Sequence, residues 1–158
     1  MKANRPAVSR PRFPGDPNPD DPLVGALLRF CLVQVEQRVH EALAAAGFHD
    51  IQVAHFKVFR FPPPEGARPI DLAQRAGMTK QAMNYLLVQL EELGYLRRVA
   101  VEGTTARLVS LTEKGWQVAE IQRATVHLIE REWEDRVGAQ RFRTFYAVLG
   151  ELAASPRP

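Results

Sequence analysis

The sequence is poor in the residues that build disulfide frameworks, metal centres and enzyme active sites. Its 158 residues contain one cysteine, Cys31, which excludes an intramolecular disulfide and is typical of a protein of the reducing cytoplasm. The four histidines are scattered along the chain, so no metal and no cofactor are expected. No Ser-His-Asp spacing, phosphate-binding glycine loop or acid-base pair occurs, and we therefore expect that the chain is not an enzyme.

Long apolar runs and a strong excess of one charge are also absent. No run of about 18 consecutive apolar residues occurs, so the sequence predicts no contact with a membrane. The 21 basic and 18 acidic residues leave a formal net charge of +3, which permits binding to a polyanion but does not identify one. Hydrophobic residues make up 46% of the chain, which is enough for one domain with a continuous core.

Proline separates the start of the chain from the rest. Prolines at positions 6, 11, 14, 17 and 19 break any helix and predict a disordered or extended arm over residues 1–20. The remainder, residues 21–158, is predicted to be a single domain. We expect a central lobe over about residues 51–112, flanked by helices over about residues 22–47 and 113–154.

Hydrophobic periodicity predicts two helices before the centre of the chain. Asp21-Pro22 has the form of an N-cap followed by proline at the first helical position, and apolar residues then recur at helical spacing up to Gly47. A second helix is predicted over roughly residues 51–61, with Asp50 as a possible cap and the proline run 62–64 as the turn that ends it.

The centre of the chain has the pattern of two helices joined by a tight turn. A short helix begins near Arg68, and Gly77 forms the turn that ends it. Thr79 can cap the next helix, which runs from Lys80 to about Glu92 with apolar residues at three- and four-residue steps. This arrangement indicates a helix-turn-helix, whose second helix can enter the major groove of DNA.

A hairpin and two further helices follow. The β-prone runs 96–101 and 106–111 are separated by four residues that include Gly103, which predicts a hairpin that serves as a wing. Residues 112–115 open a long helix that extends to Gly138, and a last helix follows it. The predicted fold class is mostly α with a small β-hairpin wing, that is, a winged helix-turn-helix flanked by N- and C-terminal helices.

The polar residues at the start of the second helix are the candidates for reading DNA. Asn and Gln can each present a donor and an acceptor to adenine, and Lys can donate to guanine or phosphate. We therefore expect DNA contacts from Thr79, Lys80, Gln81, Asn84 and Tyr85.

Arginines around this helix are candidates for phosphate contacts. They are Arg68, Arg75, Arg97, Arg98 and Arg107, of which Arg107 on the returning strand is the best candidate for a minor-groove or backbone contact. Arg97 and Arg98 adjoin on a strand and face opposite ways. At most one of the two is therefore expected to point at DNA, and the other can pair with Glu91 or Glu92.

Aromatic and polar residues on the first two helices are candidates for a ligand site. Phe30, His40, His55, Phe56 and Phe59 are expected to face the junction with the lobe, although core packing explains most of them equally well. For Cys31 a buried, unreactive thiol is favoured over a redox switch, because Phe30 and Leu32 flank it.

The run DLAQRAGMTKQAMNYLLVQLEELGYLRR (residues 71–98), followed by ARLVSLTEKG (residues 106–115), resembles the MarR family of transcriptional regulators. The likeness covers roughly residues 22–154. It implies a two-fold homodimer built from the first and last helices, with two recognition helices on a pseudo-palindromic site in double-stranded DNA. It also implies repression that a small phenolic, lipophilic or aromatic effector relieves.

The wing departs from the family pattern. An Asp-x-Arg element is usual where this chain has Gly103 and Thr105, so either Arg107 substitutes for the missing arginine or the wing contacts DNA weakly. Two other functions stay open at this point. One is a winged-helix protein-interaction module that no longer reads DNA, and the other is a redox- or metal-sensing variant.

Overall fold

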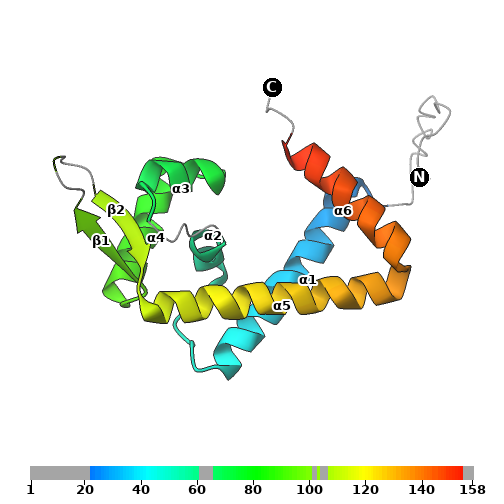
Figure 1. Ribbon diagram of the computed structural model, residues 1–158, viewed down its shortest axis with the longest axis horizontal. Helices are drawn as coiled ribbons and strands as arrows, with labels where there is room; N and C mark the ends of the chain where they lie inside the picture. Colours follow the sequence, from blue (N-terminus) through cyan, green and yellow to red (C-terminus); the bar gives the residue numbers. More distant parts are fainter. Residues whose placement is uncertain (1–21, 61–65, 101–102, 104–106, 155–158) are drawn as a thin grey trace, which may run out of the picture.

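A lobe of short helices and a two-stranded hairpin lies at one end of a long helix, α5, and α6 follows at the other end (Figure 1). The computed structural model describes residues 22–60, 66–100, 103 and 107–154. In chain order the elements are α1 (Val24–Ala45), the 3-10 turn η1 (Val53–His55), α2 (Phe56–Phe59), α3 (Pro69–Arg75), α4 (Lys80–Glu92), β1 (Leu96–Ala100), β2 (Arg107–Leu111), α5 (Glu113–Val137) and α6 (Ala139–Ala154). The predicted fold class is confirmed.

Local hydrogen bonds build the turn between α3 and α4. Gly77 has φ of 63°, in the left-handed region that glycine adopts without steric cost. Its N–H donates to the carbonyl of Gln74 at 3.2 Å, and the next N–H donates to the carbonyl of Ala73 at 2.9 Å. The side chain of Thr79 then caps α4, because its Oγ1 accepts from the N–H of Ala82 at 3.1 Å. The predicted turn and cap are both confirmed.

The hairpin packs one face against the lobe. β1 and β2 are antiparallel, with Leu96 opposite Leu111, and both of these side chains are buried. Ala67, just before α3, forms a bridge to Val109 on the outer edge of β2. The four-residue turn predicted at positions 102–105 lies outside the described residues except for Gly103, which has φ of 75°.

The core lies where α2, α4 and β1 meet the C-terminal half of α1 and the N-terminal half of α5. Its fully buried side chains include Val39, Leu43, Ile51, Phe56, Val58, Met83, Leu87, Leu90, Tyr95 and Val118. Arg38 and Glu132 form a bidentate ion pair between α1 and α5, in which Arg38 Nη2 donates to Glu132 Oε1 at 3.0 Å. The long helices are therefore tied both to the lobe and to each other.

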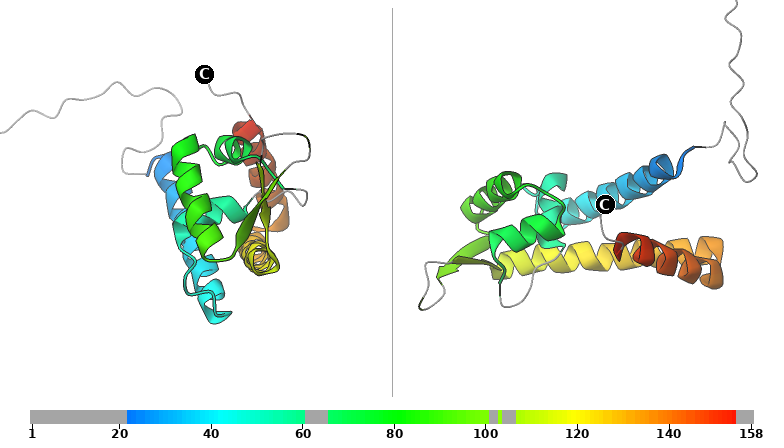
Figure 2. Two further views of the ribbon diagram at one scale, coloured as in Figure 1. Left: turned by 90° about the vertical axis from the view of Figure 1, so that its left-hand side faces the viewer. Right: turned by 90° about the horizontal axis from the view of Figure 1, so that it is seen from above.

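The N-terminal half of α1 and all of α6 lie outside this core, at the end of α5 that is far from the lobe (Figure 2). Their exposed apolar side chains are Leu23, Val24, Leu27, Leu28, Phe30, Leu32 and Val33 at the start of the chain, and Phe145, Tyr146, Val148, Leu149 and Leu152 near its end. The expectation that Cys31 is buried is wrong for the single chain. Its thiol is exposed because this half of α1 has little of the chain packed around it.

The second predicted helix differs from the structure. Only η1 and the single turn of α2 form over residues 53–59, because residues 51–52 remain extended before the turn. Asp50 is not its cap, since its carboxylate accepts from the hydroxyl of Tyr95 instead. The predicted arm over residues 1–20, the possible cap Asp21 and the proline turn 62–64 lie outside the described residues.

Candidate nucleic-acid interface

One face of α4 is polar and exposed, and the other belongs to the core. Met83, Leu86, Leu87 and Leu90 are buried, which fixes the rotation of the helix. As a result the five residues predicted to contact DNA all lie on the outer surface: Thr79, Lys80, Gln81, Asn84 and Tyr85. A tyrosine left 66% exposed on this face is available to a partner rather than to the core.

A chain of hydrogen bonds holds the hydroxyl of Tyr85 from behind. His55 Nδ1 accepts from the N–H of Gln52 at 3.2 Å, so a neutral His55 carries its proton on Nε2. That nitrogen lies 3.4 Å from Gln89 Oε1, and Gln89 Nε2 donates to the Tyr85 hydroxyl oxygen at 3.2 Å. The hydroxyl therefore accepts from inside the protein and keeps its own proton for an acceptor outside it.

Asn84 is also held in one orientation. Arg98 Nη2 donates to Asn84 Oδ1 at 3.2 Å, while Arg98 Nε donates to Glu91 at 2.9 Å. A carbonyl oxygen has two lone pairs, so Asn84 can accept from Arg98 and from an adenine at the same time. Of the two adjoining arginines, Arg98 is thus the one paired with an acid, and Arg97 is exposed.

Of the remaining candidate arginines, one forms an ion pair and two are exposed. Arg68 binds Asp71 through two hydrogen bonds of 2.7 and 2.8 Å. The hydrogen bonds from Arg68 lower the pKa of the Asp71 carboxyl, so this pair stays ionised near neutral pH. Arg75 lies exposed at the end of α3, and Arg107 lies exposed at the start of β2 beside the hairpin turn.

A buried tyrosine connects the lobe to the start of α5. Tyr95 donates its hydroxyl proton to Asp50, and Lys114 Nζ lies 3.9 Å from the centre of its ring. Burial raises the pKa of the Tyr95 hydroxyl, and Asp50 raises it further. Burial alone would raise the pKa of Asp50, but hydrogen bonds from Tyr95 and the backbone and the charge of Lys114 lower it overall. Asp50 therefore stays ionised and Tyr95 stays protonated around neutral pH.

A cavity of about 410 Å³ opens between α1, α2 and α5. Its lining combines aliphatic and aromatic walls with charged or polar groups, and comprises Val35, Glu36, Val39, Phe56, Phe59, Arg60, Trp116, Ala119, Gln122, Arg123, Val126 and His127. Of the residues predicted to form a ligand site, Phe56 and Phe59 belong to this lining. Phe30 and His40 are exposed on α1 away from it, and His55 is buried beneath α4.

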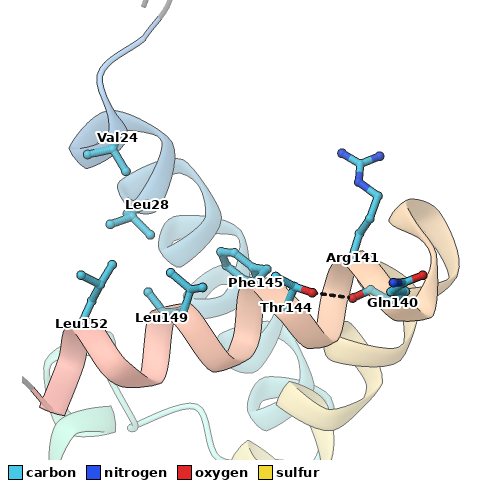
Figure 3. A pocket seen from close by; sticks show the side chains of 9 residues that line it. Val24, Leu28, Gln140, Arg141, Thr144, Phe145, Leu149 and Leu152 are labelled. Carbon is cyan, nitrogen blue, oxygen red and sulfur yellow. Dashed lines mark hydrogen bonds between the residues drawn. The ribbon is translucent and has the colours of Figure 1, made fainter. Parts of the chain in front are cut away.

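A larger apolar groove of about 570 Å³ lies between α1 and α6. In Figure 3, Val24 and Leu28 face Phe145, Leu149 and Leu152 across it, and the hydrogen bond from Thr144 to the Gln140 carbonyl lies at the far end. Apolar side chains on both walls leave this groove without polar anchors along most of its length. It is therefore suited to an apolar segment rather than to a polar ligand.

Sequence reasoning missed Trp116, Arg123 and Gln122 as residues of the cavity. The signal for Gln122 was present in the pattern, since it interrupts the buried stripe formed by Val118, Ala119, Thr125 and Ile129 on α5. A polar residue at a position of a helix that packs against the core requires an explanation, and here the explanation is the cavity.

Within the described ranges, no helix is long and apolar enough to cross a membrane. Over the same ranges, no three His, Cys, Asp or Glu side chains come together in a way that could hold a metal ion.

Comparison with known proteins finds similarity to transcriptional regulators. Residues 60–116 match the sequence profile of the MarR family. No curated protein matches the chain. The MarR family protein Rv2887 of Mycobacterium tuberculosis, solved in complex with salicylic acid, is 29% identical with a TM-score of 0.59, and the match covers 84% of this chain and 98% of that one. The same protein in complex with DNA is matched at 26% identity and a TM-score of 0.59, over 85% of this chain and all 100% of that one.

A third solved structure, CouR of Rhodococcus jostii RHA1 bound to p-coumaroyl-CoA, shares the fold at 20% identity. Its TM-score is 0.68, and the match covers 86% of this chain and 95% of that one. Both the sequence of the lobe and the arrangement of the flanking helices thus agree with one family. The lobe, residues 60–116, matches the MarR family of transcriptional regulators, and the chain has the winged helix-turn-helix fold of the solved members of that family.

Proposed function

We propose that this regulator works as a two-fold homodimer that recognises a pseudo-palindromic DNA site through α4 and represses transcription until a small apolar or aromatic molecule binds. The observation that carries the proposal is the exposed start of α4. Its Lys80, Gln81, Asn84 and Tyr85 face outward from a helix whose other side is fixed in the core. A helix presented in this way fits a major groove about 12 Å wide.

Asn84 and Tyr85 have different parts in this proposal. Arg98 orients the Asn84 amide, which can then contact the edge of an adenine with both its oxygen and its nitrogen. Tyr85 directs its remaining proton outward and donates to a phosphate oxygen. Arg97 and Arg107 are exposed on the hairpin and contact the backbone of the DNA, whereas Arg68 must first release Asp71.

The dimer is supported by the apolar side chains that α1 and α6 leave uncovered. Val24 is 72% exposed and Leu152 is 68% exposed, and both line the apolar groove in Figure 3. Leaving this much apolar surface in water is unfavourable by about 25 cal/mol per Å², so a second copy that covers it stabilises both chains. Rv2887 and CouR were solved with a salicylate and a coumaroyl thioester, which makes the cavity beside α2 the favoured effector site here.

Selection of bound fragments from a pool of random DNA tests the central claim. We expect enrichment of an inverted repeat, and absence of any enriched sequence would favour a protein-interaction module instead. On the selected site, Asn84→Ala is expected to weaken binding by about 1–3 kcal/mol and to have little effect on random DNA. Gln117→Ala, an exposed change on α5 outside this surface, is the matched control.

The dimer is tested separately by sedimentation equilibrium. Leu152→Asp places a charge in the apolar face and is expected to shift the chain to a monomer, because an unpaired charge is costly to bury. Ile70→Asp changes an equally apolar residue, 49% exposed on α3, and is expected to leave the dimer intact. A wild-type protein that is monomeric at micromolar concentration would refute this part of the proposal.

A further inference from the structure

Gln122 lines the cavity between α1, α2 and α5, and its side-chain oxygen is a buried acceptor. Its side chain is only 7% exposed, and no donor among the described residues contacts its Oε1. Its Nε2 donates to the carbonyl of Phe56 at 3.4 Å. Because a carbonyl only accepts, the amide cannot be turned around without facing one oxygen with another, and the free atom is therefore Oε1.

The walls of the cavity that Gln122 lines are largely apolar. Phe56, Phe59, Trp116 and Val126 contribute walls to the same cavity, and its charged groups include Arg60 and Arg123. A volume of about 410 Å³ lies within the range of small-molecule sites and is sufficient for a planar molecule of one or two rings. A buried acceptor without a donor is unfavourable, so a molecule that supplies the donor gains an interaction that an isosteric apolar molecule does not.

We propose that Gln122 determines which molecules the cavity accepts, and that the preferred ligand is a planar aromatic compound whose N–H or O–H group donates to Gln122 Oε1. This inference rests on the proposed role of the cavity as the effector site. It adds a chemical requirement, since an aromatic compound of the same size that carries only acceptors leaves the Gln122 oxygen unpaired and binds more weakly.

The amide nitrogen of Gln122 connects a ligand bound in the cavity to α2, because it donates to a backbone carbonyl there. Gln122 Nε2 holds the Phe56 carbonyl, and the neighbouring residue in the chain, His55, holds Gln89 behind Tyr85. A ligand that draws Gln122 toward the cavity therefore acts on the segment that supports the outward-facing hydroxyl of α4.

Indole and 1-methylindole are suitable probes, because they differ in the N–H donor and have nearly the same shape. Calorimetric titration of the full chain is expected to give about tenfold tighter binding of indole, equivalent to about 1.4 kcal/mol. In Gln122→Met this preference is expected to disappear, with 1-methylindole bound at least as tightly as by the wild type. Gln117→Met, a change at an exposed position of the same helix, is expected to keep the preference.

Equal affinity of the wild type for the two probes would overturn the inference, as would failure of both to bind or a preference that persists in Gln122→Met. The wild-type comparison stands by itself if the variant does not fold. Recognition of DNA is measured without any probe, so a failure here is distinct from a failure of the selection experiment that tests the proposed function.

Discussion

The close approach of the backbone to Gly115 gives the sharpest stability prediction. A Cβ built on Gly115, in the first turn of α5, would lie 2.0 Å from the carbonyl oxygen of Tyr95 and 3.2 Å from the Cβ of Leu111. The first of these distances is more than 1 Å inside ordinary contact, and the obstacle is backbone rather than a flexible side chain. Gly115→Ala must therefore move the start of α5 away from the end of the α4–β1 connection.

That movement strains hydrogen bonds that join the two segments. The N–H of Thr112 donates to the Tyr95 carbonyl at 3.0 Å, and the Thr112 hydroxyl donates to the Gly94 carbonyl at 2.8 Å. Overpacking costs about 1–3 kcal/mol, and each lost hydrogen bond costs about 1 kcal/mol. Alanine recovers about 1 kcal/mol through its higher helix propensity. We expect a net loss of about 2–4 kcal/mol in the free energy of unfolding.

Urea unfolding followed by circular dichroism, at one fixed protein concentration, measures this loss. Gly150→Ala is the matched control, since nothing lies within 4 Å of the added Cβ in α6 and the position is about 140° around the helix from Phe145. The control is expected to gain up to about 1 kcal/mol. A Gly115→Ala protein as stable as the wild type would refute the close approach of α5 to Tyr95.

Three further predictions concern DNA binding and pH. Tyr85→Phe and Gln89→Met are each expected to weaken DNA binding several-fold, because the first removes the hydroxyl and the second removes the hydrogen bond that orients it. The double variant is expected to bind no more weakly than the poorer single variant, and additive losses in a fluorescence titration would contradict this. Arg107→Ala is expected to weaken binding to every sequence and to reduce the slope of log K against log salt by about 1, whereas an unchanged slope would exclude a phosphate contact. The lowered pKa of Asp50 means that its stabilising effect is present above its unfolded-state pKa of about 4 and is lost as pH falls through the lower folded-state pKa. Asp50→Asn is therefore expected to be less stable than wild type at pH 7, with a difference that shrinks below about pH 4. A difference independent of pH would count against the charge of Asp50 as its source.

The elements that sequence reasoning located well are those whose ends depend on neighbouring residues. Thr79 caps α4 and Gly94, with φ of 78°, ends it, and both signals lie within a few residues of the groups that they satisfy. The exposed face of α4 followed from the same helix, because the spacing of its buried residues fixes which side is exposed.

The features that sequence reasoning missed depend on residues far apart in the chain. Asp50 was expected to cap the next helix, but its partner Tyr95 lies 45 positions away. Strand alternation predicted that only one of Arg97 and Arg98 faces DNA, and only the packing of β1 beside α4 identifies Arg98 as the partner of Glu91. The exposure of Cys31 likewise depends on what packs around α1, which periodicity alone does not specify.

The length of α5 has a mechanical consequence. Its 25 residues form one uninterrupted helix about 37 Å long, which joins the lobe to α6. Treated as a stiff lever, a rod of this length that tilts by about 5° carries its far end about 3 Å, close to the rise of one base pair along B-DNA. A small molecule bound beside Trp116, near the lobe end, would need to tilt α5 only slightly. In the proposed dimer, that tilt would change the distance between the two α4 helices so that it no longer matches the spacing of successive major grooves.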